Sequence, residues 1–146
     1  MERERILLVE DDAHVAQGLY RLLVLLGYEV DCCDSSEVAL EKLNMTGFDL
    51  VISDLRLPGM SGLDLLERVR RAKPVMRSIL ITAFHSPQAQ SQACRWANAY
   101  LSKPFEMQHF AQAVQRVLQA TPERLYQAES NGNHDSLGVL PENGPR

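Results

Sequence analysis

Five short apolar runs alternate with five segments of helical periodicity along the first 120 residues of the chain. The run from Ile6 to Val9 is continuously apolar, as is typical of a central parallel strand that is buried on both faces. Because every connection between two runs contains a helix, we expect an α/β fold with a doubly wound, five-stranded parallel sheet and helices on both of its faces. The predicted strands are 6–9, 28–33, 48–53, 78–81 and 99–102, and the predicted helices are 13–26, 35–43, 62–72, 86–96 and 106–120.

Apolar residues recur at intervals of three and four on the predicted helices, which indicates the side of each helix that packs on the sheet. Ser86 followed by Pro87 predicts the start of the fourth helix, since serine caps helix N-termini and proline suits a first turn. Trp96, at the end of that helix, is interpreted either as a core residue or as an exposed anchor for a partner. The inward residues are predicted to be Val15, Leu19, Leu22, Leu23, Leu26, Val38, Ala39, Leu43, Leu63, Leu65, Leu66, Val69, Phe110, Val114, Val117 and Leu118.

The domain is predicted to span residues 1–121. The chain has 146 residues and is 45% apolar, which suffices for one domain with its own core. The alternation of strands and helices ends at Thr121-Pro122. Residues 122–146 contain polar stretches rich in glycine, asparagine and proline, so they are expected to form a linker or a disordered tail.

Composition and charge argue against several classes of function. The net charge of −4, without a long basic patch or a metal-binding Cys/His spacing, argues against direct binding of nucleic acid. Cys32 and Cys33 are adjacent in a predicted strand and point to opposite faces, so the three cysteines do not indicate a disulfide framework. No apolar run is long enough for a signal peptide or a membrane span. We therefore expect a cytoplasmic protein without a membrane partner.

Polar residues stand where four of the predicted strands end. Glu10 and Asp11 follow the first strand, Asp54 the third, Thr82 the fourth and Lys103 the fifth. The carboxyl ends of parallel strands lie on one edge of the sheet, so these side chains should converge. Three clustered carboxylates repel one another unless a hard cation lies between them, and Mg²⁺ suits carboxylate ligands while leaving room for a phosphate oxygen. Lysine and threonine would then contact the remaining phosphate oxygens.

The segment after the third strand is predicted to be a tight loop. Asp54 ends an apolar run, and Pro58, Gly59 and Gly62 follow it within eight positions. Taken alone, Asp54 could simply cap a turn, because aspartate is common in turns. The other strand-end residues favour a functional site instead.

The combination of these motifs resembles the receiver domain of two-component response regulators, over residues 5–120. The resemblance implies the flavodoxin-like (βα)5 fold of that family. Two departures are the interval of 21 positions from Thr82 to Lys103, one shorter than in the family, and Trp96 where a small residue is common. The matching residues are Glu10-Asp11, Asp54, Leu57-Pro58-Gly59, Gly62, Thr82-Ala83 and Tyr100 to Phe105.

The resemblance implies that Asp54 accepts a phosphoryl group from a histidine kinase or a histidine phosphotransfer protein. It also implies that Mg²⁺ is held by Asp11, Asp54 and the backbone carbonyl of Arg56, with Glu10 acting through water. Lys103 and Thr82 would assist this transfer. Such a domain is not an enzyme toward other substrates, because it catalyses only its own phosphorylation and dephosphorylation.

The same resemblance implies a conformational switch and residues that set the lifetime of the phosphoryl group. Thr82 and Tyr100 occupy the positions of the family's hydroxyl and aromatic switch, and we expect phosphorylation to turn the Tyr100 ring from an exposed to a buried position. The face made by the fourth helix, the fifth strand and the fifth helix would then bind an output protein or a second copy. Arg56 and Phe84 are expected to flank the phosphoryl group and to slow its hydrolysis.

Other classes fit the sequence less well. A phosphatase of the haloacid dehalogenase type needs a second acidic residue two positions after its aspartate, where this chain has Arg56. A flavin-binding module needs a glycine- and hydroxyl-rich loop after the first strand, where this chain has carboxylates. Two alternatives stay open: a receiver fragment of a longer transcriptional regulator without its output domain, and a receiver-like scaffold that is never phosphorylated.

Overall fold

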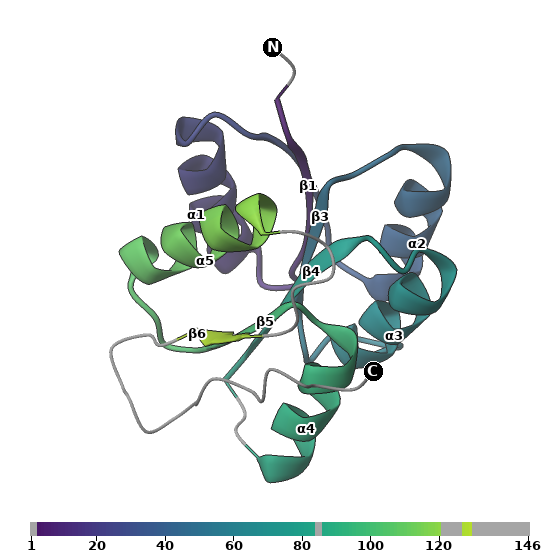
Figure 1. The fold of residues 1–146 in the computed structure, drawn as a ribbon. Coiled ribbons are helices and arrows are strands. Elements are labelled where there is room, and N and C mark those ends of the chain that lie inside the picture. Colours follow the sequence, from purple (N-terminus) through teal and green to yellow (C-terminus); the bar gives the residue numbers. More distant parts are fainter. Residues whose placement is uncertain (1–2, 84–85, 121–126, 130–146) are drawn as a thin grey trace.

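The computed structural model describes residues 3–83, 86–120 and 127–129, which form a parallel sheet between two layers of helices (Figure 1). All neighbouring strands are parallel, in the order β2-β1-β3-β4-β5-β6. The doubly wound α/β fold with five helices is thereby confirmed. The strands are β1 (Arg5–Val9), β2 (Glu29–Cys33), β3 (Leu50–Asp54), β4 (Arg77–Thr82), β5 (Ala99–Ser102) and β6 (Gln127–Glu129), and the helices are α1 (Ala13–Leu25), α2 (Ser36–Met45), α3 (Gly62–Ala72), α4 (Pro87–Trp96) and α5 (Met107–Gln119).

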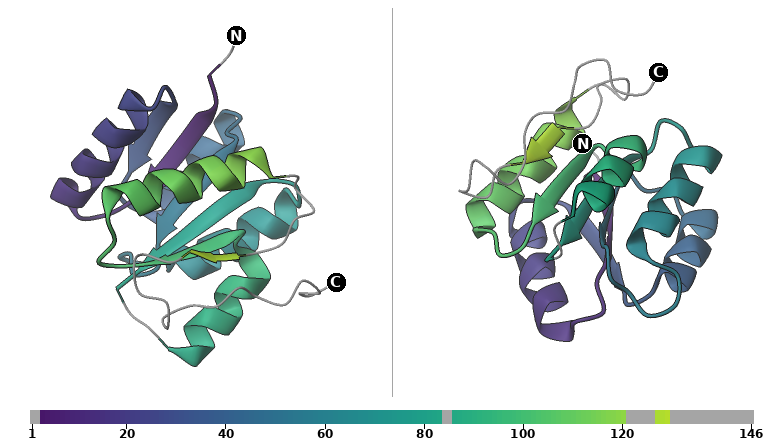
Figure 2. Two further views of the ribbon diagram at one scale, coloured as in Figure 1. Left: turned by 60° about the vertical axis from the view of Figure 1, so that its left-hand side comes forward. Right: turned by 90° about the horizontal axis from the view of Figure 1, so that it is seen from below.

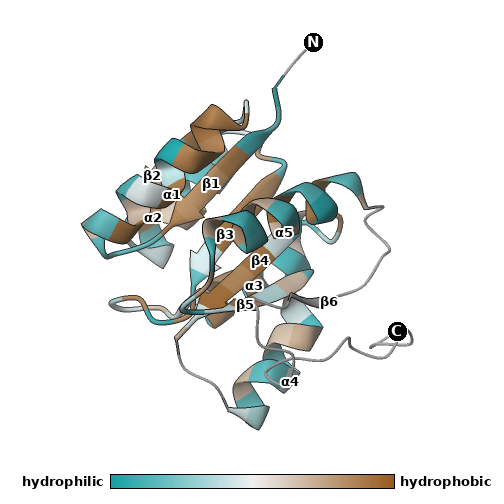
Figure 3. Ribbon diagram, turned by 90° about the vertical axis from the view of Figure 1, so that its left-hand side faces the viewer, coloured by the Kyte–Doolittle hydropathy of each residue, from teal (hydrophilic) through white to brown (hydrophobic). Residues whose placement is uncertain are grey.

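Helices α1 and α5 cover one face of the sheet, and α2, α3 and α4 cover the other (Figures 1 and 2). Strand β1 supplies both cores, because successive side chains of a strand point to opposite faces. Ile6 and Leu8 pack with α1 and α5, whereas Leu7 and Val9 pack with the other layer. The middle parts of the central strands are therefore apolar, and these strands are largely brown in Figure 3.

Side-chain caps fix where four of the helices begin. Asp12 precedes α1, and one of its carboxylate oxygens accepts hydrogen bonds from backbone amides of the first turn. Ser35, Ser61 and Ser86 do the same for α2, α3 and α4. The predicted start of α4 at Ser86 and Pro87 is confirmed, since the Ser86 hydroxyl accepts from the amide of Ala89 at 3.0 Å. Such caps typically stabilise a helix by about 1 kcal/mol.

Leu65 is fully buried, as predicted, but Val38 and Leu26 remain 36% and 47% exposed. Leu26 lies beyond the last residue of α1, so it leaves the packed face of that helix. Val38 lies beside a surface hollow between α1 and α2. Periodicity alone does not show which turn of a helix extends past the neighbouring layer.

Trp96 is half-buried against the core that α2, α3 and α4 share. The guanidinium groups of Arg71 and Arg95 lie 4.9 and 5.3 Å from the centre of its ring, within the range of a cation–π interaction. Trp96 is therefore a partly buried packing residue, intermediate between the predicted core residue and the predicted exposed anchor.

A sixth strand extends the sheet beyond β5. Residues 127–129 pair in parallel with β5, with Tyr100 opposite Ala128. This finding differs from the prediction, which assigned these three residues to a linker or tail. Their short polar sequence shows no strand pattern, so the pairing depends on the free edge of β5. The rest of the predicted tail lies outside the described residues.

Cys32, Cys33 and Cys94 are all free thiols. Burial raises the pKa of the Cys33 thiol to about 11, which disfavours its reactive thiolate form.

None of the described helices combines the length and the apolar character needed to cross a bilayer.

Candidate functional site

The strand-end residues meet at the carboxyl edge of the sheet, as the sequence predicts. Glu10 follows β1, Asp54 ends β3, Thr82 ends β4 and Lys103 follows β5. The register aligns these ends, because Asp54 lies opposite Ile81 on β4 and β4 in turn pairs with β5. Glu10, Asp54 and Thr82 are buried although they are polar. Buried polar groups that gather at one edge of an open α/β sheet are typical of a functional site.

Lys103 joins two of the carboxylates. Its Nζ lies 3.0 Å from Oδ2 of Asp54 and 3.2 Å from Oε1 of Glu10. Burial acts to lower the pKa of Lys103, but the hydrogen bond and charge of Asp54, together with the charge of Glu10, outweigh it and raise the pKa overall. The ammonium group is therefore positively charged at neutral pH. It provides a fixed positive charge beside Asp54.

Glu10 is the most buried carboxylate of the site. Burial raises its pKa, and the nearby charge of Asp54 adds to this effect, whereas the backbone amide of Asp12 and the charge of Lys103 oppose it. Its Oε2 accepts a hydrogen bond from the Asp12 amide at 3.1 Å, and its Oε1 contacts Lys103. Both carboxylate oxygens of Glu10 thus already have protein partners, which suits a role beside a cation through water.

The acidic cluster has a donor set suited to a hard divalent cation. Ligand oxygens of Glu10, Asp11 and Asp54 all lie within 4.8 Å of one another, and Asp11 is exposed to solvent. Oxygen ligands of this kind, with open positions for water, fit Mg²⁺. The Asp12 carboxylate instead caps α1 and is not part of this cluster.

Thr82 and Tyr100 lie on adjacent strands beneath this edge, and both are fully buried. The position of Tyr100 differs from the expectation that its ring starts exposed. The ring packs in the core shared by α2, α3 and α4, where burial also raises the pKa of its hydroxyl. Arg56 follows β3 and is exposed. Phe84 lies outside the described residues.

The loop between β3 and α3 is as tight as predicted. Gly59 has φ of +76°, a conformation that side-chain-bearing residues rarely adopt. Gly62 packs so closely against the end of β3 that a Cβ there would overlap the backbone carbonyl oxygen of Asp54. The Gly62 amide also donates to the carbonyl of Leu55 at 2.8 Å. The loop is thus folded back on the strand that presents Asp54.

Two residues of α2 contact this loop, and the sequence analysis missed both. The fully buried Ser36 donates from its hydroxyl to the carbonyl of Ser61 at 3.3 Å. The Glu37 carboxylate accepts a hydrogen bond from the Met60 amide at 3.1 Å. The only sequence signal was the start of a helix at this point, which does not indicate contacts 23 and 25 positions further along the chain.

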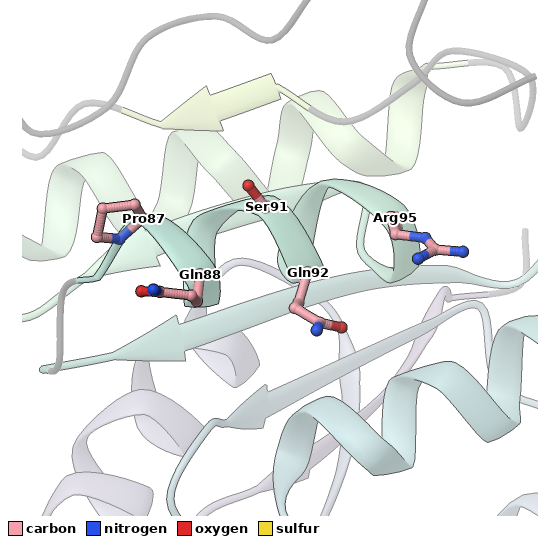
Figure 4. Close-up of a pocket in the computed structure, with 5 residues that line it drawn as sticks. All are labelled: Pro87, Gln88, Ser91, Gln92 and Arg95. Atoms are coloured by element: carbon pink, nitrogen blue, oxygen red, sulfur yellow. The ribbon is translucent and has the colours of Figure 1, made fainter.

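A hollow of about 320 Å³ lies along α4, and no residue of the acidic cluster lines it (Figure 4). Within the described part of the chain its lining comes from this one helix, and all of its lining residues are exposed. A surface lined by a single helix can bury little of a small ligand. The lining residues are Pro87, Gln88, Ser91, Gln92 and Arg95.

A parallel α/β sheet that presents an aspartate, an acidic pair, a lysine and a buried hydroxyl at one edge defines a phospho-acceptor signalling domain. The family model of the response regulator receiver domain matches residues 6–115. The chain belongs to this family, whose members act in two-component signal transduction. The resemblance inferred from the motifs is therefore confirmed.

Known relatives agree with this assignment. The chain is 40% identical to the response regulator protein FleR of Pseudomonas aeruginosa over 113 residues, which cover 77% of this chain and 24% of FleR. A CheY-like receiver domain structure from Methanospirillum hungatei has a TM-score of 0.77 at 29% identity and covers 80% of this chain and 94% of its own. The response regulator TrrA of Thermotoga maritima, in complex with Mg²⁺ and BeF, has a TM-score of 0.73 at 32% identity over 78% of this chain and 98% of its own.

Proposed function

We propose that the γ-carboxylate of Asp54 accepts a phosphoryl group from a phosphohistidine. The observation that carries this proposal is the ion pair of 3.0 Å between Asp54 and Lys103 beside the acidic pair. A carboxylate oxygen of Asp54 attacks phosphorus while the phosphorus–nitrogen bond of the donor breaks, and the released imidazole takes up a proton from solvent. Such in-line transfer depends on positioning and charge stabilisation.

The acidic cluster fits Mg²⁺, with Asp11, Asp54 and the carbonyl of Arg56 as proposed ligands and Glu10 acting through water. When bound, the cation would neutralise charge on the transferring phosphoryl oxygens. Lys103, whose Nζ lies 3.0 Å from Asp54, would stabilise a further phosphoryl oxygen. The buried Thr82 places a hydroxyl at the end of the adjacent strand, where it can donate to a third oxygen.

The proposed donors are a histidine kinase or a histidine phosphotransfer protein. The domain itself would act only on Asp54 and would not turn over a separate substrate. The chain spans 24% of FleR, 61% of YkoG of Bacillus subtilis and 52% of VanRB of Enterococcus faecalis, so an output domain is proposed by analogy with those longer regulators.

The proposed output face consists of α4, β5 and α5. Tyr100 links the site to this face, because it lies on β5 in register with Leu80, two residues before Thr82 on β4. The ring is already buried, so we propose that phosphorylation repacks the Thr82 and Tyr100 pair inside the core. Strand β6 lies along the free edge of β5 and is therefore part of the same face (Figure 1).

A label-transfer experiment separates this function from that of a scaffold that is never phosphorylated. A histidine phosphotransfer domain carrying radiolabelled phosphate is mixed with the protein in Mg²⁺ and, separately, in excess chelator. The proposal requires label on the wild-type protein in Mg²⁺ and none on Asp54→Asn. A protein that stays unlabelled with this donor and with small phosphodonors would be a scaffold.

A further inference from the structure

We propose that Glu37 is a positioning residue for the loop after Asp54 and thereby sets the affinity of the site for Mg²⁺. This inference rests on the proposed function, because the same loop supplies the Arg56 carbonyl as a ligand. Glu37 itself lies on α2, outside the residues that contact the phosphoryl group or the cation.

Different parts of the fold hold different parts of the loop. Its first residue, Leu55, is fixed by a hydrogen bond of 2.7 Å from its amide to the carbonyl of Ile81 on β4. Its second half is held from α2, through the Glu37 bond to the Met60 amide and the Ser36 bond to Ser61. The Arg56 carbonyl lies between these two anchors, so its position depends on both.

The Glu37 carboxylate also lies close to the backbone of Gly59. A Cβ at Gly59 would lie 2.9 Å from Oε2 and 3.3 Å from Oε1 of Glu37. The carboxylate thus lies against the main chain at Gly59, and it accepts a hydrogen bond from the amide of the next residue, Met60. A glutamate in the first turn of a helix also complements the helix dipole, but that role requires no contact with another loop.

Removing the contact should weaken cation binding without removing a ligand. A loop freed from α2 would occupy several positions, and only the fraction in the competent one binds with full affinity. Glu37 is exposed to solvent, so its hydrogen bond should contribute no more than an ordinary intramolecular one. Its loss should raise the Mg²⁺ concentration for half-saturation by about threefold to tenfold. Glu37→Gln keeps an acceptor oxygen and should restore most of the affinity.

The test measures Mg²⁺ binding by calorimetry on unphosphorylated full-length protein, and the Mg²⁺ dependence of phosphorylation by acetyl phosphate. Glu37→Ala is compared with wild type, with Glu37→Gln and with Glu41→Ala, which removes an equal charge from the exposed side of the same helix one turn later. The proposal expects weaker binding in Glu37→Ala alone, with the maximal phosphorylation rate little changed.

Equal half-saturation in Glu37→Ala and wild type would overturn the inference, as would equal weakening in Glu41→Ala, which would indicate a general charge effect. If Glu37→Ala and Glu41→Ala only lowered the stability of the folded protein, the Mg²⁺ concentration for half-saturation would not change. A shift in that concentration therefore distinguishes a positioning role from a structural role. Wild-type protein that binds no Mg²⁺ and accepts no phosphoryl group would instead refute the proposed function itself.

Discussion

Replacing Lys103 with methionine isolates the electrostatic role of its ammonium group, because methionine preserves most of the apolar stem. The Glu10 side chain is 2% exposed, that of Asp54 11% and that of Lys103 23%. Removing one partner of a buried ion pair typically costs about 3–5 kcal/mol, because a buried charge remains uncompensated. The partial exposure of Lys103 reduces this, so we expect a loss of about 2–3 kcal/mol in the free energy of unfolding at pH 7 without divalent cations.

The loss should depend on pH in a defined direction. Burial raises the pKa of Glu10 above 4.5, so the folded domain takes up this proton at a higher pH than the unfolded chain does. The deficit of Lys103→Met should shrink as pH falls from 7 toward 5, since a protonated Glu10 needs no counter-ion. The pKa of Lys103 is raised, so its contribution to folding stability depends on pH in the alkaline range. This contribution is complete below the ordinary pKa of 10.5 and is lost only as the pH rises above that value.

Urea unfolding followed by circular dichroism measures the effect. With a typical slope of about 2 kcal/mol per molar urea, the midpoint of Lys103→Met should fall by about 1–1.5 M at pH 7. The control is Lys42→Met, which removes a surface ion pair to Asp31 of 3.1 Å and should cost about 1 kcal/mol or less. Equal effects of the two changes, or a Lys103→Met deficit that does not vary with pH, would refute the reasoning.

Three further outcomes are expected. Gly62→Ala should lose at least about 2 kcal/mol of stability in urea unfolding, because its Cβ would overlap the Asp54 carbonyl, whereas Gly47→Ala, with open space around it, should change stability by less than about 0.5 kcal/mol. Asp11→Asn should weaken Mg²⁺ binding more than Asp12→Asn in calorimetry, since Asp12 is a helix cap that asparagine can replace; equal losses would contradict the assigned ligands. Arg56→Ala should shorten the half-life of phosphorylated protein, measured by phosphate release, and an unchanged half-life would show that this side chain does not exclude water.

The sequence predicted the parts of the site that depend on strand topology. Glu10, Asp54, Thr82 and Lys103 each follow or end an apolar run, and parallel pairing brings such ends together whatever the details of the loops. The start of α4 could also be predicted from the sequence, because the cap at Ser86 is a local interaction. These features depend on periodicity and on neighbours within four positions of the chain.

Features that depend on packing between distant segments were missed or mistaken. The Glu37 contact with Met60 requires the exact approach of a loop to a helix, which a pattern of residue types does not encode. The burial of the Tyr100 ring depends on the space left between β5 and the helices that cover it. The pairing of β6 depends on an open sheet edge and not on any strand propensity of residues 127–129.

The central claim is that Asp54 is the phosphorylated residue. The most direct measurement is the intact mass of the protein after incubation with acetyl phosphate and Mg²⁺, for wild type and Asp54→Ala, with the exposed Asp64→Ala as a control. The account expects one added phosphoryl group on wild type and on Asp64→Ala, and none on Asp54→Ala. Stoichiometric phosphorylation of Asp54→Ala, at Asp11 or at any other residue, would contradict it.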